Sequence, residues 1–329
     1  MKADQPNSMA NRSIEHLSVA GAADTAAIRA LVRKHKRHDL VFAVIGLLCL
    51  LVGLFALLAL LLDMAIKGVP RIDWGFFTNF PSRKAENAGI LSAWVGSSLV
   101  MLVTAAAAVP VGVAAGLYLE EYARKNWFTG IIEINISNLA GVPSIVYGLL
   151  ALGLFVYEFK LGQSILAAGL TLALLILPIV IVATREAIRS IPQQIREGAY
   201  SLGATKWQLV RDHIVPYATP GILTGVIIGM ARAIGETAPI ITIGALTFIA
   251  FLPPPPYSGD PGQPAAGLFD WLFSPFTVMP IQMFNWTSRP EEAFQVNAAA
   301  AGLVLVFMTL AMNGLAIWLR YRLRKNIKW

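Results

Sequence analysis

The sequence has little of what builds a disulfide-bonded or metal-binding protein. Its 329 residues include one cysteine, Cys49, which cannot form an intrachain disulfide. The four histidines lie outside the apolar segments, and no Cys/His cluster has metal-ligand spacing. We therefore predict no metal or haem site on this chain.

Charged residues are also scarce. Asp, Glu, Lys and Arg make up 14% of the chain, against about 25% in an average soluble domain, whereas 56% of the residues are hydrophobic. The mean hydropathy is +0.63. Apolar residues stand in runs of about twenty or more, the length that crosses the hydrocarbon core of a bilayer. This composition excludes an ordinary soluble domain and predicts an all-α integral membrane protein.

Six apolar segments are long enough to span a membrane as helices. The predicted spans are roughly 40–62, 94–119, 131–157, 162–184, 221–250 and 296–319. The first is too long, and begins too far from the N-terminus, to be a cleaved signal peptide. We predict a partly disordered cytoplasmic segment over 1–39, the membrane domain over 40–319 and a basic cytoplasmic tail over 320–329.

Lysine and arginine are unevenly divided between the two sides that alternating spans define. Nineteen lie in the N-terminal segment, the 120–130 and 185–215 connections and the tail, against six in the opposite connections. Because basic residues are enriched on the cytoplasmic side of membranes, both termini are predicted to lie in the cytoplasm. The net charge of +7 is thus a topology signal, with some affinity for anionic lipids. It does not indicate nucleic-acid binding.

The cytoplasmic connection over 185–216 is amphipathic rather than a plain linker. Its apolar residues follow helical spacing up to Leu202, and Gly203 comes directly after them. Glycine adopts positive φ readily and commonly ends helices. The pattern predicts a helix, a glycine turn and a second helix, both lying parallel to the membrane. Pro216 and Pro220 are then expected to break the chain before the fifth span.

The 251–295 connection is predicted to be a long external loop. It opens with the four prolines from Pro253 to Pro256, which exclude a helix at that point. It also carries several Trp and Phe residues. Such side chains suit a segment that lies at the membrane interface or packs against an external partner.

The third predicted span contains helix-weakening residues. Gly141, Pro143 and Gly148 lie within a few positions of one another. The backbone groups that such residues free are tolerated in lipid only where protein buries them or where they line a cavity. The segment is therefore either a kink that helps packing or a pore-lining or gating break. The gating residues predicted on the second interpretation are Pro143, Ser144 and Tyr147.

Arg232 and Glu236 lie inside the fifth predicted span, four residues apart and hence on one helix face. An arginine at the centre of a span costs at least about 2.5–3.5 kcal/mol to insert, so it usually faces a cavity or pairs with a carboxylate. Its planar fork of donors also suits an oxyanion. The pair either lines a translocation pathway, together with Thr237, or is a structural ion pair that fixes helix rotation.

The spacing of one set of residues in the 185–216 connection is specific. The set is Glu197-Gly198-Ala199, Gly203 and Val215-Pro216. It resembles the EAA loop of bacterial ABC importer permeases, whose pattern is E-A-A, three residues, G, nine residues, I-x-L-P. The departures from this pattern are Gly198, His213 and Val215. The resemblance implies a loop that docks on a separate ATPase and carries its motion to the spans. The implied coupling residues are Glu197, Ala199, Gly203 and Pro216.

Four further strings narrow the resemblance. They are PVGVAAGLYLEEYA at 110–123, NLAGVPSIVYG at 138–148, GMARAIGETAP at 229–239 and FNWTSRP at 284–290. Together they resemble the A-type permease of phosphate-specific ABC importers, from about residue 40 to the C-terminus. This implies a subunit of a bacterial inner membrane that forms half of a phosphate pore. The implied partners are a C-type permease, an ATPase dimer and a periplasmic phosphate-binding protein, with membrane lipids around the spans.

Other functions remain open. The sequence contains no G-x-x-x-x-G-K-[ST] motif, so ATP with Mg²⁺ would bind to the partner ATPase, and we expect no cofactor on this chain. A permease for another oxyanion, such as sulfate or molybdate, is the nearest alternative. A carrier without an ATPase would leave the EAA-like loop unused. A membrane enzyme is disfavoured because no H-E-x-x-H or G-x-S-x-G motif is present.

Overall fold

The computed structural model describes residues 7–255 and 267–324, and every regular element in these two ranges is helical. Parts of three predicted segments lie outside the described residues: the first six residues of the N-terminal segment, 256–266 of the external loop and the last five of the tail. Five helices are long and apolar enough to cross a membrane, and one bent pair brings the number of possible spans to six. The predicted all-α, six-span fold class is confirmed.

The first helix, α1, runs over Asn7–Gly68 and is followed by a 3₁₀ turn, η1, over Val69–Arg71. It contains the candidate span Asp39–Arg71, which includes the predicted 40–62 segment. Residues 7–39, expected to be partly disordered, continue the same helix. The chain divides after Asp63 into two compact units, and the second unit holds the remaining spans.

Three of these spans are single helices without a sharp bend. They are α3 (Leu91–Leu117, extended by the π-helical turn η3 over Tyr118–Tyr122), α6 (Ile165–Arg189) and α12 (Glu292–Arg324). Helices α3 and α6 pack closely because glycines of α3 face β-branched side chains of α6. An added Cβ at Gly112 would lie 2.7 Å from Val180, and one at Gly116 would lie 2.7 Å from Thr184, both on α6. The small residues of the second span thus act in packing.

The third span is not one straight helix, which agrees with the interruption predicted from Gly141 and Pro143 within the 131–157 segment. It consists of α4 (Trp127–Leu139), α5 (Ser144–Ala151) and the π-helical segment η4 (Leu152–Glu158). The two arms are bent by 105° at the break over 140–143. Pro143, at φ −56° and ψ 135°, is the cause, because it cannot continue the hydrogen bonding of the preceding helix.

The fifth span also differs from its predicted bounds of 221–250. A continuous helix runs over Lys206–Gly235 and comprises α8 (Lys206–Gln208), the π-helical segment η5 (Leu209–Ile214) and α9 (Val215–Gly235). Pro216 and Pro220 therefore do not break the chain. Pro216 is the second residue of α9, at the point where the hydrogen bonding of the continuous helix changes from the π-helical segment that ends at Ile214 to the α-helical pattern. The second half of the loop is the start of this span, not a separate helix parallel to the membrane.

After α9 the chain breaks at Glu236 and Thr237 and resumes as α10 (Ala238–Ile243). Gly244 ends α10 in the left-handed conformation, with φ +97°. Helix α10 packs against α5. At the contact an added Cβ on Gly148 would overlap Thr242 and lie 2.6 Å from the Cα of Pro239. The two interrupted spans therefore meet next to their breaks.

Much of the predicted external loop belongs to the packed bundle. Its last part forms α11 (Met279–Thr287), which packs against α12 and α3. Trp286 is fully buried and its ring centroid lies 6.0 Å from that of Phe76 in α2 (Trp74–Thr78). Two 3₁₀ turns, η2 (Ala85–Asn87) and η6 (Asp270–Phe273), lie in the connections before α3 and α11. The tryptophan of the FNW string is thus a core anchor.

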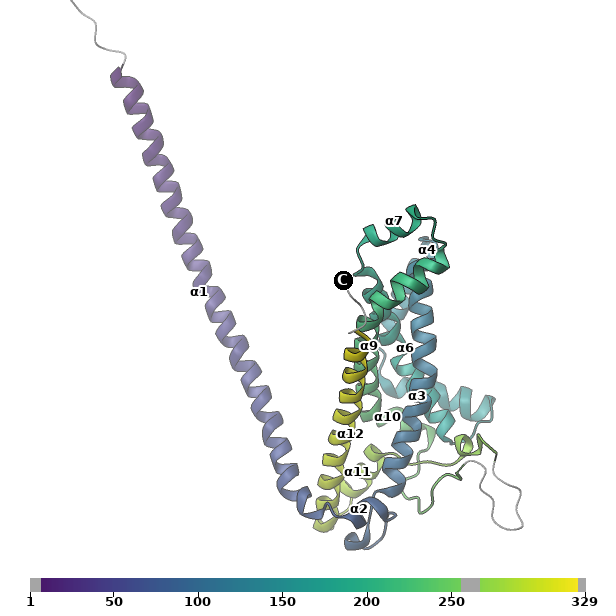
Figure 1. Cartoon of the computed structure of the whole chain (residues 1–329). Helices are drawn as coiled ribbons and strands as arrows, with labels where there is room; N and C mark the ends of the chain where they lie inside the picture. The colour runs from purple at the N-terminus through teal and green to yellow at the C-terminus, as the bar shows by residue number, and fades with distance from the viewer. Residues whose placement is uncertain (1–6, 256–266, 325–329) are drawn as a thin grey trace, which may run out of the picture. The chain divides into compact units, whose positions relative to one another are not determined.

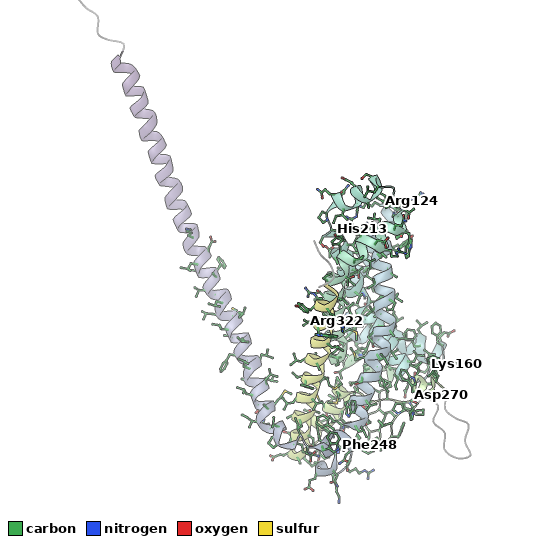
Figure 2. The ribbon with its side chains drawn as sticks, in the orientation of Figure 1. Arg124, Lys160, His213, Phe248, Asp270 and Arg322 are labelled. Carbon is green, nitrogen blue, oxygen red and sulfur yellow. The ribbon has the colours of Figure 1, made fainter. Side chains whose placement is uncertain are left out.

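The second unit has two distinct ends. Helix α7 (Gln193–Ser201) lies at one end, and α12 runs toward it from the end that carries α2 (Figure 1). Arg124 and His213 lie at the α7 end, whereas Phe248 lies at the other (Figure 2). The 120–130 and 185–215 connections therefore share one end of the bundle, as the distribution of basic residues requires.

We expect Gly148→Val to destabilise the contact between α5 and α10. The new side chain has to displace Pro239 or Thr242, and overpacking of this kind costs about 1–3 kcal/mol. The melting temperature of the purified protein in detergent should fall by several degrees. Gly153→Val is the matched control, because no atom lies within 4 Å of its added Cβ. A Gly148→Val protein that melts with the native one would show that the two helices do not pack this closely.

Candidate functional site

The predicted pathway residues Arg232, Glu236 and Thr237 lie at the break between α9 and α10. Arg232 is in the last turn of α9, and Glu236 is the first residue after the helix. The prediction that placed Arg232 in the middle of a continuous span is therefore wrong. The guanidinium Nε donates to Glu236 Oε1 at 3.2 Å, which confirms that the two side chains pair. Thr237 connects this pair to α10, and its hydroxyl donates to the Gly235 carbonyl at 3.5 Å.

The two partners differ in exposure. The Arg232 side chain is 38% exposed, whereas that of Glu236 is 18% exposed. In the described part of the chain, no hydrogen bond occupies the two terminal nitrogens of Arg232. Glu236 therefore holds one edge of the guanidinium, and the fork of the remaining donors is available to an anion from outside this chain.

The predicted gating residues lie at the other break. Pro143 precedes α5 and Ser144 begins it, while Tyr147 is buried one turn later. The Tyr147 hydroxyl donates to the carbonyl of Leu139 at 2.8 Å, which also accepts the Val142 N–H at 3.1 Å, so the side chain ties α5 to the end of α4. Tyr147 also belongs to the same buried cluster as Met230 and Ala233, which flank Arg232 in α9. The structure thus brings Tyr147 and Arg232, which are far apart in sequence, into one neighbourhood.

The interior of the bundle leaves little space beside this site. A cavity of about 10 Å³ lies next to Glu236 and is lined by residues of α3, α9, α10 and the segment before α11, including Ser97, Met101, Ile240 and Val278. A cavity of this size holds about one water molecule. A group larger than a water molecule does not fit into this cavity, and the open side of the guanidinium is its exposed one.

The EAA-like loop forms the predicted helix and glycine turn. Gly203 has φ +82°, and the N–H groups of Gly203 and Ala204 donate to the carbonyls of Tyr200 and Ala199, both at 3.0 Å. This is a Schellman motif, which ends a helix with a left-handed residue. Thr205 then starts the next helix with a capping box to Gln208. Gly203 is the turn residue because its conformation is costly for a residue with a side chain.

The coupling residues named from the loop fall into two groups. Ala199 is buried in a cluster with Ile188, Leu209 and Ile214, which fixes α7 on the end of the bundle. Glu197 is exposed on the outer side of α7. Pro216 lies inside the packed helix and is not part of the exposed loop. Large apolar side chains are exposed around the turn: Leu202 at 90%, Trp207 at 61% and Tyr200 at 48%.

A network of charged residues lies near the loop, and the sequence patterns did not predict it. Arg185 contacts Glu133 at 2.7 Å and Glu120 at 3.5 Å, and Arg189 donates to Glu120 at 2.9 Å. Arg196 of α7 contacts Glu121 at 2.8 Å. Glu120 and Glu121 belong to the YLEEY segment, so their adjacency in a mostly apolar string was the signal that could have identified them. In the described residues, no group of three potential metal ligands occurs.

The sequence and the fold were compared with those of known proteins. Residues 108–259, which contain the charged network, the loop and both breaks, match the family model "Binding-protein-dependent transport system inner membrane component". A phosphate transport system permease protein PstA of Xylella fastidiosa is 32% identical over 85% of this chain and 92% of its own length. The chain belongs to this inner membrane component family. It is thus a multi-pass permease of a binding-protein-dependent transport system.

Two further comparisons agree with the assignment. The PstA protein of Yersinia pestis is 31% identical to the permease over 85% of this chain and 89% of its own length. A chain of a bacterial alginate ABC transporter, solved with an alginate-bound periplasmic protein, aligns with a TM-score of 0.59. That alignment covers 86% of this chain and 94% of the other at 13% identity, so it shows the fold alone.

Proposed function

We propose that this permease carries inorganic phosphate into the cell as one half of an ABC importer pore. The observation that carries the proposal is Arg232, whose terminal donors are free of partners in the described residues while Glu236 neutralises its charge. A guanidinium fork matches the oxygens of phosphate in spacing and charge. The PstA names of the relatives support phosphate over sulfate or molybdate.

The exposed position of Arg232 supports a pore shared with a second subunit. A charged side chain that faces lipid is costly, so in the membrane a polar surface of another subunit has to cover the guanidinium. The second half of the pore on this proposal is a C-type permease, and a periplasmic phosphate-binding protein delivers the ion. The cleft between the two permeases then contains Arg232 on one wall.

The α7 end supports a cytoplasmic contact with an ATPase dimer. Leu202, Trp207 and Tyr200 are apolar and exposed around a rigid turn, as expected for a surface that a partner covers. With this end in the cytoplasm, the basic connections obey the positive-inside rule, and both termini are cytoplasmic. ATP and Mg²⁺ bind to the partner on this proposal, because the chain has no phosphate-binding loop and is not itself an enzyme.

The first test concerns Arg232. We expect Arg232→Gln to lower ATP-driven phosphate uptake by about ten- to a hundredfold, the loss of a charge-assisted hydrogen bond worth about 1.5–3 kcal/mol. Arg232→Lys should retain part of the activity, because it keeps the charge but loses the fork. Uptake of ³²P-phosphate into proteoliposomes that hold the whole transporter measures the effect, with sulfate and molybdate as competitors.

The double variant Arg232→Gln with Glu236→Gln separates the two interpretations of the pair. It contains no unpaired charge, so a purely structural ion pair predicts that uptake recovers. A pathway arginine predicts that the double variant assembles normally and stays inactive. Recovery of uptake, or transport of sulfate in preference to phosphate by the native protein, would contradict the proposal.

The second test concerns the loop. We expect Gly203→Asp to leave the transporter assembled but to uncouple ATP hydrolysis from uptake, because it adds a charge to the docking surface. Gly162→Asp is a matched control: Gly162 also has positive φ, +68° against +82°, and neither added Cβ has an atom within 4 Å. The backbone strain, about 1–2 kcal/mol, is thus similar in both variants. The ratio of phosphate transported to ATP hydrolysed is the measurement. Equal ratios in the two variants would rule out docking at Gly203.

A further inference from the structure

Two adjacent carboxylates at the end of η3 connect this segment to two other elements of the α7 end. Glu120 and Glu121 are both well buried, with side chains 12% and 8% exposed. Buried carboxylates of this kind are stable only when they are paired and hydrogen-bonded. Here each has arginine partners from a different element, α6 for Glu120 and α7 for Glu121.

The Glu121 partner, Arg196, is held by four hydrogen bonds. Its Nε and one terminal nitrogen donate to Glu121 Oε1 at 3.2 and 2.8 Å. The terminal nitrogens also donate to the carbonyls of Ile191 and Ile188 at 2.9 and 3.1 Å. Ile188 lies in the last turn of α6, and Ile191 follows the C-cap of this helix. Arg196 therefore ties α7 to the ends of α3 and α6 with one side chain.

The Glu120 side of the network fixes the same region. Arg185 is 6% exposed and lies between Glu120 at 3.5 Å and Glu133 of α4 at 2.7 Å. Arg189, one turn further along α6, donates to Glu120 at 2.9 Å. The ends of α3, α4 and α6 are thereby joined before Arg196 adds α7. A displacement of α7 thus acts on all three at once.

The apolar contacts of α7 come from two of its residues, Ala199 and the half-buried Ile195, which pack in one cluster with Ile188 and Leu209. It has nine residues, and Ala199 is its only buried residue. Tyr200 and the following Leu202 are exposed. Because this apolar surface is small, the orientation of the helix depends also on the polar contacts of Arg196.

We propose that Arg196 and Glu121 form a permanent clamp that makes α7 move as one body with the ends of α3 and α6. This inference rests on the proposed coupling to an ATPase and names the positioning residues that the coupling requires. The clamp stays closed throughout the cycle. It differs from a latch, which would have to open for transport, and from a contact in which Arg196 touches the ATPase itself.

The test compares Arg196→Gln with Arg211→Gln. Arg211 is a matched control in the same connection, because among the described residues its one ion pair is with its exposed neighbour Asp212, at 2.7 Å. We expect Arg196→Gln to lower the phosphate transported per ATP at least tenfold while the ATPase stays bound and active. Spin labels at Gln194 and Lys125 should give a narrow distance distribution in the native protein and in Arg211→Gln, and a broad one in Arg196→Gln.

A covalent replacement separates the clamp from its rivals. In a Cys49→Ala background, Glu121→Cys with Arg196→Cys removes the ion pair and should uncouple the transporter. A short bismaleimide that links the two cysteines should restore the transport ratio to within about threefold. Failure of the linked protein to recover would overturn the clamp, as expected for a latch or for an ATPase contact.

The distance measurement does not depend on the transported ion. If the native transporter failed to move phosphate, the proposed function would be wrong, but a broad distribution confined to Arg196→Gln would still support the clamp. A native-like narrow distribution in Arg196→Gln would reject the clamp even if phosphate uptake were normal in the native protein.

Discussion

The hydrocarbon core of a membrane offers no hydrogen-bond partner to the backbone, and the arrangement of this permease follows from that constraint. Two of its spans are interrupted, over 140–143 and at Glu236 and Thr237. Interrupted backbone is tolerated in a membrane only where protein buries it or where it lines a wet cavity. The two breaks satisfy this condition together: α5 packs on α10, and the Leu139 carbonyl at the first break accepts from both the Val142 N–H and the Tyr147 hydroxyl.

On our proposal, the transported ion passes the same place. A break in a helix can hold an ionised pair that a continuous lipid-facing helix cannot, and Arg232 with Glu236 occupies it. The α7 end is built on another principle, with buried carboxylates that join three helix ends to the loop. On our proposals, a movement of α7 is transmitted to α6 and α9. These two helices pack closely through small residues. An added Cβ at Gly225 of α9, for example, would overlap Ala183 of α6.

The sequence predicted what depends on local chemistry. Apolar length located the spans, Gly203 marked the turn of α7, and the spacing of Arg232 and Glu236 placed them on one face. It failed where tertiary packing decides. Pro216 and Pro220 resembled helix breakers but lie within a continuous helix, whereas Pro143 does bend its span. Arg196 and Glu121 are far apart in the chain, and no local pattern indicates their contact.

The central claim is that the two breaks border the route of the transported ion. A cysteine at Thr237, in a Cys49→Ala background, tests this most directly in the reconstituted transporter. A small charged methanethiosulfonate reagent should modify it, and saturating phosphate should slow the modification at least tenfold. A cysteine at Phe307, an exposed position on α12, should show no protection by phosphate. A cysteine at 237 that never reacts, or that reacts equally fast with and without phosphate, would contradict the account.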